Sequence, residues 1–195
     1  MVRRIIYLVR HGQYEATTVP PNEPDGSLTD AGREQAQLTG NRLKTFPIET
    51  IHYSPLQRTQ ETMEILAGQF PNASLQSSPL LKECIPSVPE AFEQHFAHLP
   101  EDFVKAGKLQ AKQAFEAFFR PPRESEGDQH ELIVAHGNLI SHFVCQTLQA
   151  PLDAWVNIDI HHCGISELFI SATGFMKLIH HNEIRHLPHH LQTFD

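Results

Sequence analysis

The sequence has few cysteines, no run of basic residues and no long apolar segment. Its three cysteines are odd in number and form no Cys-x-x-Cys motif, a pattern that fits a reducing compartment better than a disulfide framework. The formal net charge is -8, which argues against sequence-independent binding of nucleic acid. The apolar stretch at 5–9 is too short for a signal peptide or a membrane span. We therefore expect a soluble cytoplasmic protein with no nucleic-acid or membrane partner.

The composition is that of a globular protein with a real core. The chain has 195 residues, of which 40% are hydrophobic and 19% charged, enough for one ordinary domain over 1–195. Strand-like and helix-like segments alternate, without internal repeats. This order predicts an α/β fold, a three-layer α/β/α sandwich with a mixed, mostly parallel sheet. Prolines punctuate residues 84–125, which we expect to form a helical insertion over the active site.

Local patterns predict the individual elements. Apolar, β-rich runs predict strands at 5–10, 50–53, 131–135, 165–170 and 175–179, the last two forming a hairpin. Capping residues and helical spacing predict helices from Thr29 to Leu43, from Ser54-Pro55 onward, over 101–119 and after His136. Residues 14–27 read as a polar loop. The last ten residues, polar and rich in histidine, read as a surface tail.

Two of the predicted strands end in the same unusual way. The stretch LVRHG ends the first strand with Arg10 and His11, and IVAHGN ends a later one with His136. Ligands of parallel α/β sheets bind beyond the carboxyl ends of the strands. Either histidine alone would more often be a core residue satisfied by backbone partners, but together we expect both imidazoles to reach one crevice.

A third segment supplies a cation for the same crevice. The sequence Ser54-Pro55-Leu56-Gln57-Arg58 follows a strand and opens a helix. Helix N-termini attract anions, and an arginine fork adds two donors in a fixed geometry. Arg10 and Arg58 together therefore suit a phosphoryl group, although Arg58 taken alone could equally be a solvated surface residue.

These motifs resemble the histidine phosphatase superfamily, also called phosphoglycerate-mutase-like, over most of the chain. The match comprises Arg10-His11-Gly12, Leu28-Thr29 to Ala36, the Ser54 to Arg58 turn and His136-Gly137-Asn138, in the family's order. A closer likeness is to the mitochondrial serine/threonine-phosphatase branch, through residues 28–36, 83–86 and 136–155. The membrane anchor of that branch has no match in this sequence. Lys82-Glu83-Cys84 stands where the branch usually has Arg-Glu-Gly.

The resemblance implies a role for each residue of the site. His11 would be the nucleophile that becomes a phosphohistidine. Arg10, Arg58 and a protonated His136 would hold the phosphoryl group, and Glu83 would be the proton donor. Glu83 could instead be a surface carboxylate, and Glu90 and Glu93 are rival donors in the same Pro-rich segment.

Three histidine pairs invite a metal site, which we do not expect. They are His161-His162, His180-His181 and His189-His190. Adjacent residues of a strand point to opposite faces, so such pairs rarely chelate together. The site cations can supply the positive charge that phosphoryl transfer needs. We expect no metal and no other cofactor.

The sequence therefore predicts a metal-independent phosphomonoester hydrolase whose substrate is a phosphorylated protein or a small phosphomonoester. By resemblance a phosphoserine or phosphothreonine protein is favoured. The alternatives are a small-molecule phosphatase and a catalytically silent phosphate-binding module. A mutase is less favoured, because mutases of this superfamily carry longer insertions that hold the sugar acid. The rim after Glu83 is apolar and rich in proline, whereas the basic residues lie farther along, at Lys105, Lys108, Lys112, Arg120 and Arg123. A bis-anionic metabolite would need further cations beside the site.

Overall fold

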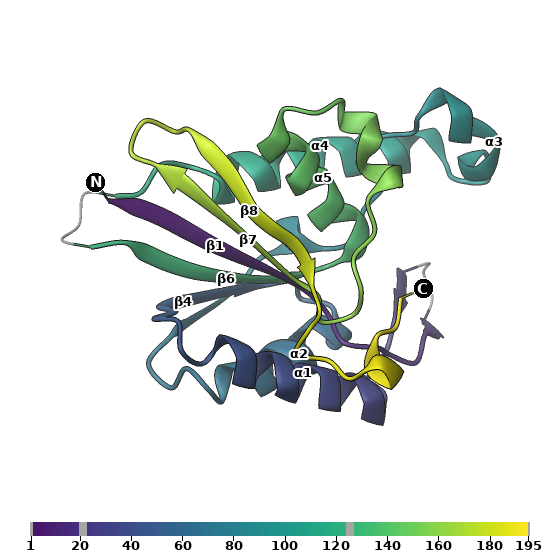
Figure 1. Cartoon of the computed structure of the whole chain (residues 1–195). Helices are drawn as coiled ribbons and strands as arrows, with labels where there is room; N and C mark the ends of the chain where they lie inside the picture. The colour runs from purple at the N-terminus through teal and green to yellow at the C-terminus, as the bar shows by residue number, and fades with distance from the viewer. Residues whose placement is uncertain (1, 20–22, 124–126, 195) are drawn as a thin grey trace.

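The centre of the molecule is a six-stranded sheet with the order β5-β4-β6-β1-β7-β8, which separates two groups of helices in Figure 1. The computed structural model describes residues 2–19, 23–123 and 127–194. The strands are β1 (Arg3–Arg10), β4 (Thr50–Tyr53), β5 (Ser74–Ser77), β6 (Gln129–Ala135), β7 (Ile165–Ser171) and β8 (Met176–Glu183). The neighbours from β5 to β1 pair in parallel, whereas β7 is antiparallel to both β1 and β8. The predicted mixed, mostly parallel sheet is confirmed.

Helices cover both faces of this sheet, as predicted for a three-layer sandwich. Helices α1 (Asp30–Leu43) and α2 (Gln57–Ala67) lie on one face, and α4 (Glu101–Phe118) and α5 (Gly137–Leu148) on the other (Figure 1). Shorter elements are the hairpin β2 (Thr17–Val19) and β3 (Glu23–Asp25), helix α3 (Glu93–Phe96), and the 3-10 helices η1 (Pro79–Leu81), η2 (Glu90–Phe92), η3 (Leu152–Asn157) and η4 (His189–Leu191). The predicted loop at 14–27 thus contains a small hairpin, and its residues 20–22 lie outside the described residues.

Strand β1 lies between two separate hydrophobic cores. Ile6 and Leu8 pack into the core under α4 and α5, whereas Ile5, Tyr7 and Val9 pack into the core under α1 and α2. Alternate residues of a strand point to opposite faces, so a central strand covered on both faces is apolar throughout. This burial explains why the run before Arg10 lacks alternation of polar and apolar residues.

The segment predicted as an insertion connects η1 with β6 and contains η2, α3 and α4. The long helix α4 packs through Ala111, Ala114 and Phe118 into the core that it shares with α5. Helix α3 lies beyond the sheet, next to the start of α4 (Figure 1). Residues 124 and 125 of the predicted insertion lie outside the described residues.

Two local predictions are wrong. The second helix begins at Gln57 with Leu56 in the cap position, not at Ser54-Pro55; the hydroxyl of Ser54 accepts from the amide of Leu56 at 3.3 Å and also contacts His136. The C-terminal segment is not a surface tail, because Leu187 and Leu191 are buried beside Ala36 of α1. Their burial gives this polar segment an apolar anchor. Within the described ranges, no helix is both long and apolar enough to cross a membrane.

Candidate active site

The candidate site lies where β1 and β6 end side by side. The two strands pair up to Arg10 and Ala135, and the amide of His11 donates to the carbonyl of Ala135 at 3.0 Å. The rings of His11 and His136 consequently lie with their centroids 5.2 Å apart. Parallel pairing in this register places both strand ends at one edge of the sheet, so the two histidines lie close together there.

A glycine is required immediately after His11. A Cβ atom on Gly12 would lie 2.6 Å from the carbonyl oxygen of Gly32 in α1, closer than atoms can approach without displacing the backbone. The amide of Gly12 also donates to the hydroxyl of Thr62 in α2 at 3.0 Å. This close approach holds the turn after β1 against both helices.

His11 is buried and has one nitrogen tied to the backbone. Its Nδ1 lies 2.9 Å from the carbonyl oxygen of Gly12, which can only accept, so the proton is on Nδ1 and the lone pair on Nε2. Nε2 accepts a hydrogen bond from Nε of Arg58 at 3.2 Å. Burial, followed by the influence of His136, Arg58 and Arg10, holds the pKa of His11 well below its usual value, against the opposing Gly12 bond. The ring is therefore neutral and can act as a nucleophile at neutral pH.

Arg58, in the first turn of α2, joins the parts of the site. Besides the bond to His11, its guanidinium donates to Nδ1 of His136 at 3.1 Å and to the carboxylate of Asp25 at 3.1 Å. The group lies over the ring of Tyr14, 4.7 Å from its centroid. The side chain is only 4% exposed. Arg58 is thus a buried site residue, and the alternative of a solvated surface arginine is wrong.

His136 is neutral in this structure, contrary to the expectation of a protonated ring. A guanidinium only donates, so the contact with Arg58 makes Nδ1 of His136 an acceptor. The proton is then on Nε2, which lies 2.9 Å from the hydroxyl of Ser54. Burial, followed by the charges of Arg58 and Arg10, lowers the pKa of His136 well below its usual value. The positive charge of the site therefore comes from the two arginines.

Arg10 is buried at the end of β1 and reaches the start of α5. Its guanidinium donates to the carbonyl of Ile160 at 2.7 Å, and its own carbonyl accepts from the amide of Cys163 at 3.1 Å. A Cβ atom on Gly137 would be 3.6 Å from the guanidinium carbon. Arg10 therefore adds a second cation beside the N-terminus of α5, which itself favours anions.

Glu83 approaches the same helix N-terminus from the segment after η1. Its carboxylate accepts from the amides of Cys84 at 3.0 Å and of Asn138 at 3.4 Å. Burial raises the pKa of Glu83, although both amides and the two site arginines oppose the rise. The rival acids Glu90 and Glu93 are exposed on η2 and α3. Among these three acids, Glu83 has the environment suited to keeping a proton.

A cleft of about 440 Å³ extends from these residues toward α3 and the start of α4. Arg58 and Glu83 line its inner end. The rest of the lining is mostly apolar, with Leu56, Cys84, Ile85, Phe96, Leu99 and Phe103 beside His95 and His98. The lysines of α4 line a different hollow. The sequence-based expectation of an apolar rim with few cations beside the site agrees with this lining.

Sequence reasoning missed three residues of the site. Asp25, the last residue of β3, holds Arg58, and its other oxygen accepts from the amide of Gln57 at 2.8 Å, so it caps α2 from a distant part of the chain. Tyr14 packs edge-on against His11. His162, considered only as a metal ligand, lies with its ring 5.5 Å from that of His11. No local pattern marks these residues, because each reaches the site only through tertiary packing.

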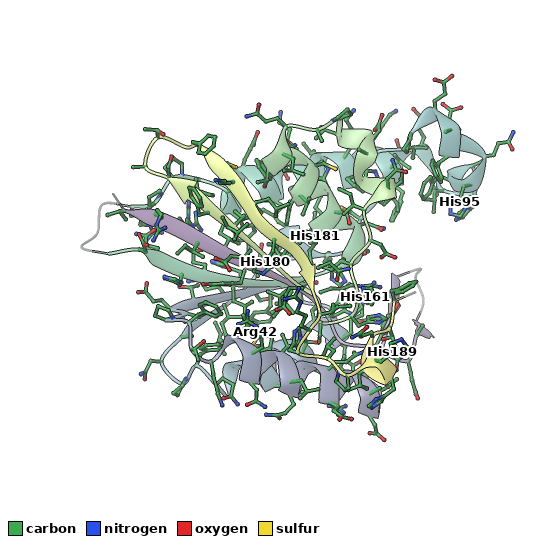
Figure 2. All side chains as sticks on the ribbon, viewed as in Figure 1. Arg42, His95, His161, His180, His181 and His189 are labelled. Atoms are coloured by element: carbon green, nitrogen blue, oxygen red, sulfur yellow. The ribbon has the colours of Figure 1, made fainter. Side chains whose placement is uncertain are left out.

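The histidine pairs come from different segments of the chain. Figure 2 shows His180 and His181 on β8, His161 nearer the end of the sheet and His189 beside α1, while His95 is on the distant α3. Across the ranges 2–19, 23–123 and 127–194, no group of three or more His, Cys, Asp or Glu residues could hold a metal ion.

Comparison with known proteins agrees with this geometry. The chain is 35% identical over 97% of its length to the mitochondrial serine/threonine-protein phosphatase Pgam5 of Drosophila grimshawi. It is 36% identical over 90% of its length to the mitochondrial PGAM5 of Xenopus tropicalis. It spans 66% and 63% of these relatives' lengths. Both are named as mitochondrial proteins, which contradicts the expectation of a cytoplasmic location.

Solved structures show the same fold. A phosphoglycerate mutase from Plasmodium falciparum superposes with a TM-score of 0.66 at 28% identity, covering 97% of this chain and 94% of that one. The α-ribazole phosphatase from Shigella flexneri superposes with a TM-score of 0.71 at 19% identity, covering 92% and 96%. The sequence profile of one family matches residues 6–183. The chain belongs to the histidine phosphatase superfamily, branch 1.

Proposed function

We propose that this protein hydrolyses phosphomonoesters through a phosphohistidine on His11. One observation carries the proposal. The Nε2 atom of His11 holds a lone pair between Arg58 and His136, because Nδ1 is tied to the carbonyl of Gly12. Burial first, and then His136 and the cations that would bind a phosphoryl group, keep His11 neutral. The two arginines thus contribute both to phosphoryl binding and to keeping the nucleophile neutral.

In the first step Nε2 of His11 attacks phosphorus while the bond from phosphorus to the ester oxygen breaks. Arg10 and Arg58 stabilise the charge on the equatorial oxygens, a contribution on the order of a thousandfold for one well-placed arginine. The leaving oxygen takes the proton of Glu83, whose pKa burial has raised. A bound phosphate dianion raises that pKa further, so the acid form is present when it is needed.

In the second step a water molecule attacks the phosphohistidine. Glu83, now ionised, takes a proton from this water, the bond between phosphorus and Nε2 breaks, and phosphate leaves. His11 returns to its neutral form with the proton still on Nδ1. The step needs no metal, because the two arginines supply the positive charge. Treatment with EDTA should therefore leave turnover unchanged, and activity restored by one specific divalent ion would contradict this.

The substrate we propose is phosphoserine or phosphothreonine in a protein. Two observations support it. The relatives from Drosophila grimshawi and Xenopus tropicalis are named serine/threonine-protein phosphatases. The cleft beside Arg58 and Glu83 is mostly apolar, and the described residues that line it include no Lys and no other Arg. A phosphorylated side chain on an extended peptide suits that surface better than a second anionic group does. We also propose that residues 1–195 form one domain in which 84–125 covers the site.

The experiment combines intermediate trapping with a substrate panel. Labelled substrate quenched under basic conditions should leave acid-labile phosphate on His11, and His11→Ala should abolish turnover without unfolding the protein. His95→Ala, which changes an exposed histidine of the outer cleft, is the matched control and should retain the chemical step. Retained turnover in His11→Ala would refute the mechanism. Phosphate bound but never turned over would indicate a silent binding module. Higher kcat/KM on 3-phosphoglycerate or fructose 2,6-bisphosphate than on phosphopeptides would indicate a small-molecule phosphatase.

A further inference from the structure

A second hollow, of about 620 Å³, lies between α4 and the segment from α5 to η3. It contains none of the residues assigned to the reaction. Its lining combines apolar side chains with a row of lysines, and comprises Pro86, Ser87, Lys105, Lys108, Leu109, Lys112, Phe115, Glu116, His142, Gln146, Leu152 and Asp153. Leu109 and Leu152 are 56% and 39% exposed. We call this hollow the α4 groove. Its size and mixed lining are those of a binding site.

The lysines of the α4 groove form a row along one helix. Lys105, Lys108 and Lys112 are three and four residues apart, so a rise of 1.5 Å per residue spreads them over roughly 10 Å. The first and last pair with Glu101 and Glu116 at 2.7 and 3.9 Å, but all four side chains are well exposed. Such surface pairs exchange readily for another anion. A row of this length in a chain of net charge -8 suits an elongated acidic ligand rather than a single anionic group.

The α4 groove is also lined by a buried histidine whose ring nitrogens have no hydrogen-bond partner among the described residues. His142 is 3% exposed, and neither of its ring nitrogens forms a hydrogen bond within the described residues. Burial lowers its pKa to about 4, so the ring is neutral and offers one donor and one acceptor. Unsatisfied buried polar groups are rare in proteins. A peptide backbone carries both an acceptor carbonyl and a donor amide, whereas the carboxylate of a fatty acid only accepts.

The α4 groove and the active-site cleft lie on either side of one short segment. Cys84 and Ile85 line the cleft, and the next two residues, Pro86 and Ser87, line the groove. The indole of Trp155 donates to both the carbonyl and the hydroxyl of Ser87, at 3.2 and 3.0 Å. This segment is therefore a fixed common wall, and one polypeptide can follow it from the cleft into the groove.

We propose that the α4 groove docks an acidic segment of the phosphoprotein substrate, with apolar residues between the acidic ones. Carboxylates along the segment pair with Lys105, Lys108 and Lys112, while the apolar side chains cover Leu109 and Leu152. Glu116 and Asp153 also line the groove and disfavour carboxylates close to them. This inference rests on the proposed phosphatase function, because it concerns how the same site selects its substrate.

The test uses two phosphothreonine peptides that differ only in a distal block. One carries an alternating Glu-Leu block beyond a Gly/Ser linker, and the other carries an alternating Lys-Leu block. Intramolecular docking raises the local concentration of the phosphothreonine, so the Glu-Leu peptide should have about a tenfold lower KM with unchanged kcat. Lys108→Glu/Lys112→Glu should abolish this difference while leaving turnover of p-nitrophenyl phosphate unchanged. The control Lys44→Glu/Lys177→Glu changes net charge equally at exposed positions outside both hollows and should keep the difference.

A binding measurement separates failure of docking from failure of the proposed function. The labelled Glu-Leu block, without phosphothreonine, should bind the intact protein in fluorescence anisotropy, and the Lys108→Glu/Lys112→Glu variant should bind it at least tenfold more weakly. That result would stand even if no phosphopeptide were turned over, in which case only the phosphatase proposal would fall. Equal KM values for the two peptides, or equal binding of the block to all variants, would overturn the docking proposal. If the KM difference between the peptides were lost both in Lys108→Glu/Lys112→Glu and in the control Lys44→Glu/Lys177→Glu, the effect would come from net charge alone. That result would also overturn the docking proposal.

Discussion

Replacing Glu83 with Gln separates proton donation from packing, because the amide keeps the shape of the carboxyl group but cannot donate its proton. The side-chain oxygen of Gln can still accept from the amide of Cys84, 3.0 Å away in the native protein. Loss of general acid catalysis costs about a hundredfold to ten-thousandfold. We expect that loss in kcat for alkyl phosphates. For p-nitrophenyl phosphate, whose leaving group needs little protonation, we expect about tenfold or less.

The same substitution should stabilise the fold at neutral pH. Burial raises the folded-state pKa of Glu83 above its unfolded value, so its contribution to stability is complete below the unfolded pKa and is lost as pH rises through the folded pKa. Each unit by which the pKa is raised costs about 1.4 kcal/mol at pH 7. The 3.4 Å contact with the amide of Asn138 is lost in the variant, which offsets part of the gain. We expect unfolding to cost about 1 kcal/mol more at pH 7, equivalent to a rise of about 2–4 °C in Tm.

The assays are steady-state kinetics on both substrates and urea unfolding at pH 7 and pH 4. The gain in stability should be present at pH 7 and absent at pH 4, where the native carboxyl group is protonated. Glu90→Gln and Glu93→Gln are the matched controls at exposed positions and should change neither the kinetic constants nor the stability. Equal losses on the two substrates would refute Glu83 as the acid, and a leaving-group effect in either control variant would move the role to that residue. Lower stability of Glu83→Gln at pH 7 would refute the argument from burial.

Three further predictions follow from contacts in and beside the site. Arg58→Lys keeps the charge but loses the guanidinium that donates to His11, His136 and Asp25, so kcat/KM should fall on the order of a thousandfold. Steady-state kinetics showing near-native activity would contradict this. Gly12→Ala should destabilise the protein in urea by about 1–3 kcal/mol, because its Cβ would lie 2.6 Å from the oxygen of Gly32; Gly127→Ala, with open space around its Cβ, should be nearly neutral. Burial lowers the pKa of His142 to about 4. The neutral ring therefore contributes stability that is complete above about pH 6.5 and is lost as pH falls through the folded-state pKa. His142→Leu should therefore reduce the stability lost between pH 7 and pH 4 by up to about 3 kcal/mol, and an unchanged pH dependence in urea unfolding would contradict it.

The sequence alone predicted every strand of the sheet except the edge strand β5, and it predicted the positions of the principal site residues. An apolar strand that ends in Arg10 and His11, and another that ends in His136, are local patterns. In a parallel sheet strand ends of this kind meet at one edge, so their proximity follows from the fold class. The position of Arg58 after a strand and at the start of a helix is equally local. Periodicity also predicted α4 to within one residue at its C-terminal end.

Only the tertiary structure decided the charge state of these residues and the contacts that hold them. His136 is neutral because it is buried and lies beside Arg58 and Arg10, and the hydroxyl of Ser54 contacts its ring. Asp25, at the end of β3, holds Arg58 from 33 residues away in the chain, and the final segment packs on α1 because Leu187 and Leu191 find an apolar surface there. The physical reason is the same in each case. Hydrophobic periodicity and capping act between near neighbours in the chain, whereas protonation, burial and hydrogen-bond pairing depend on groups that only the folded chain brings together.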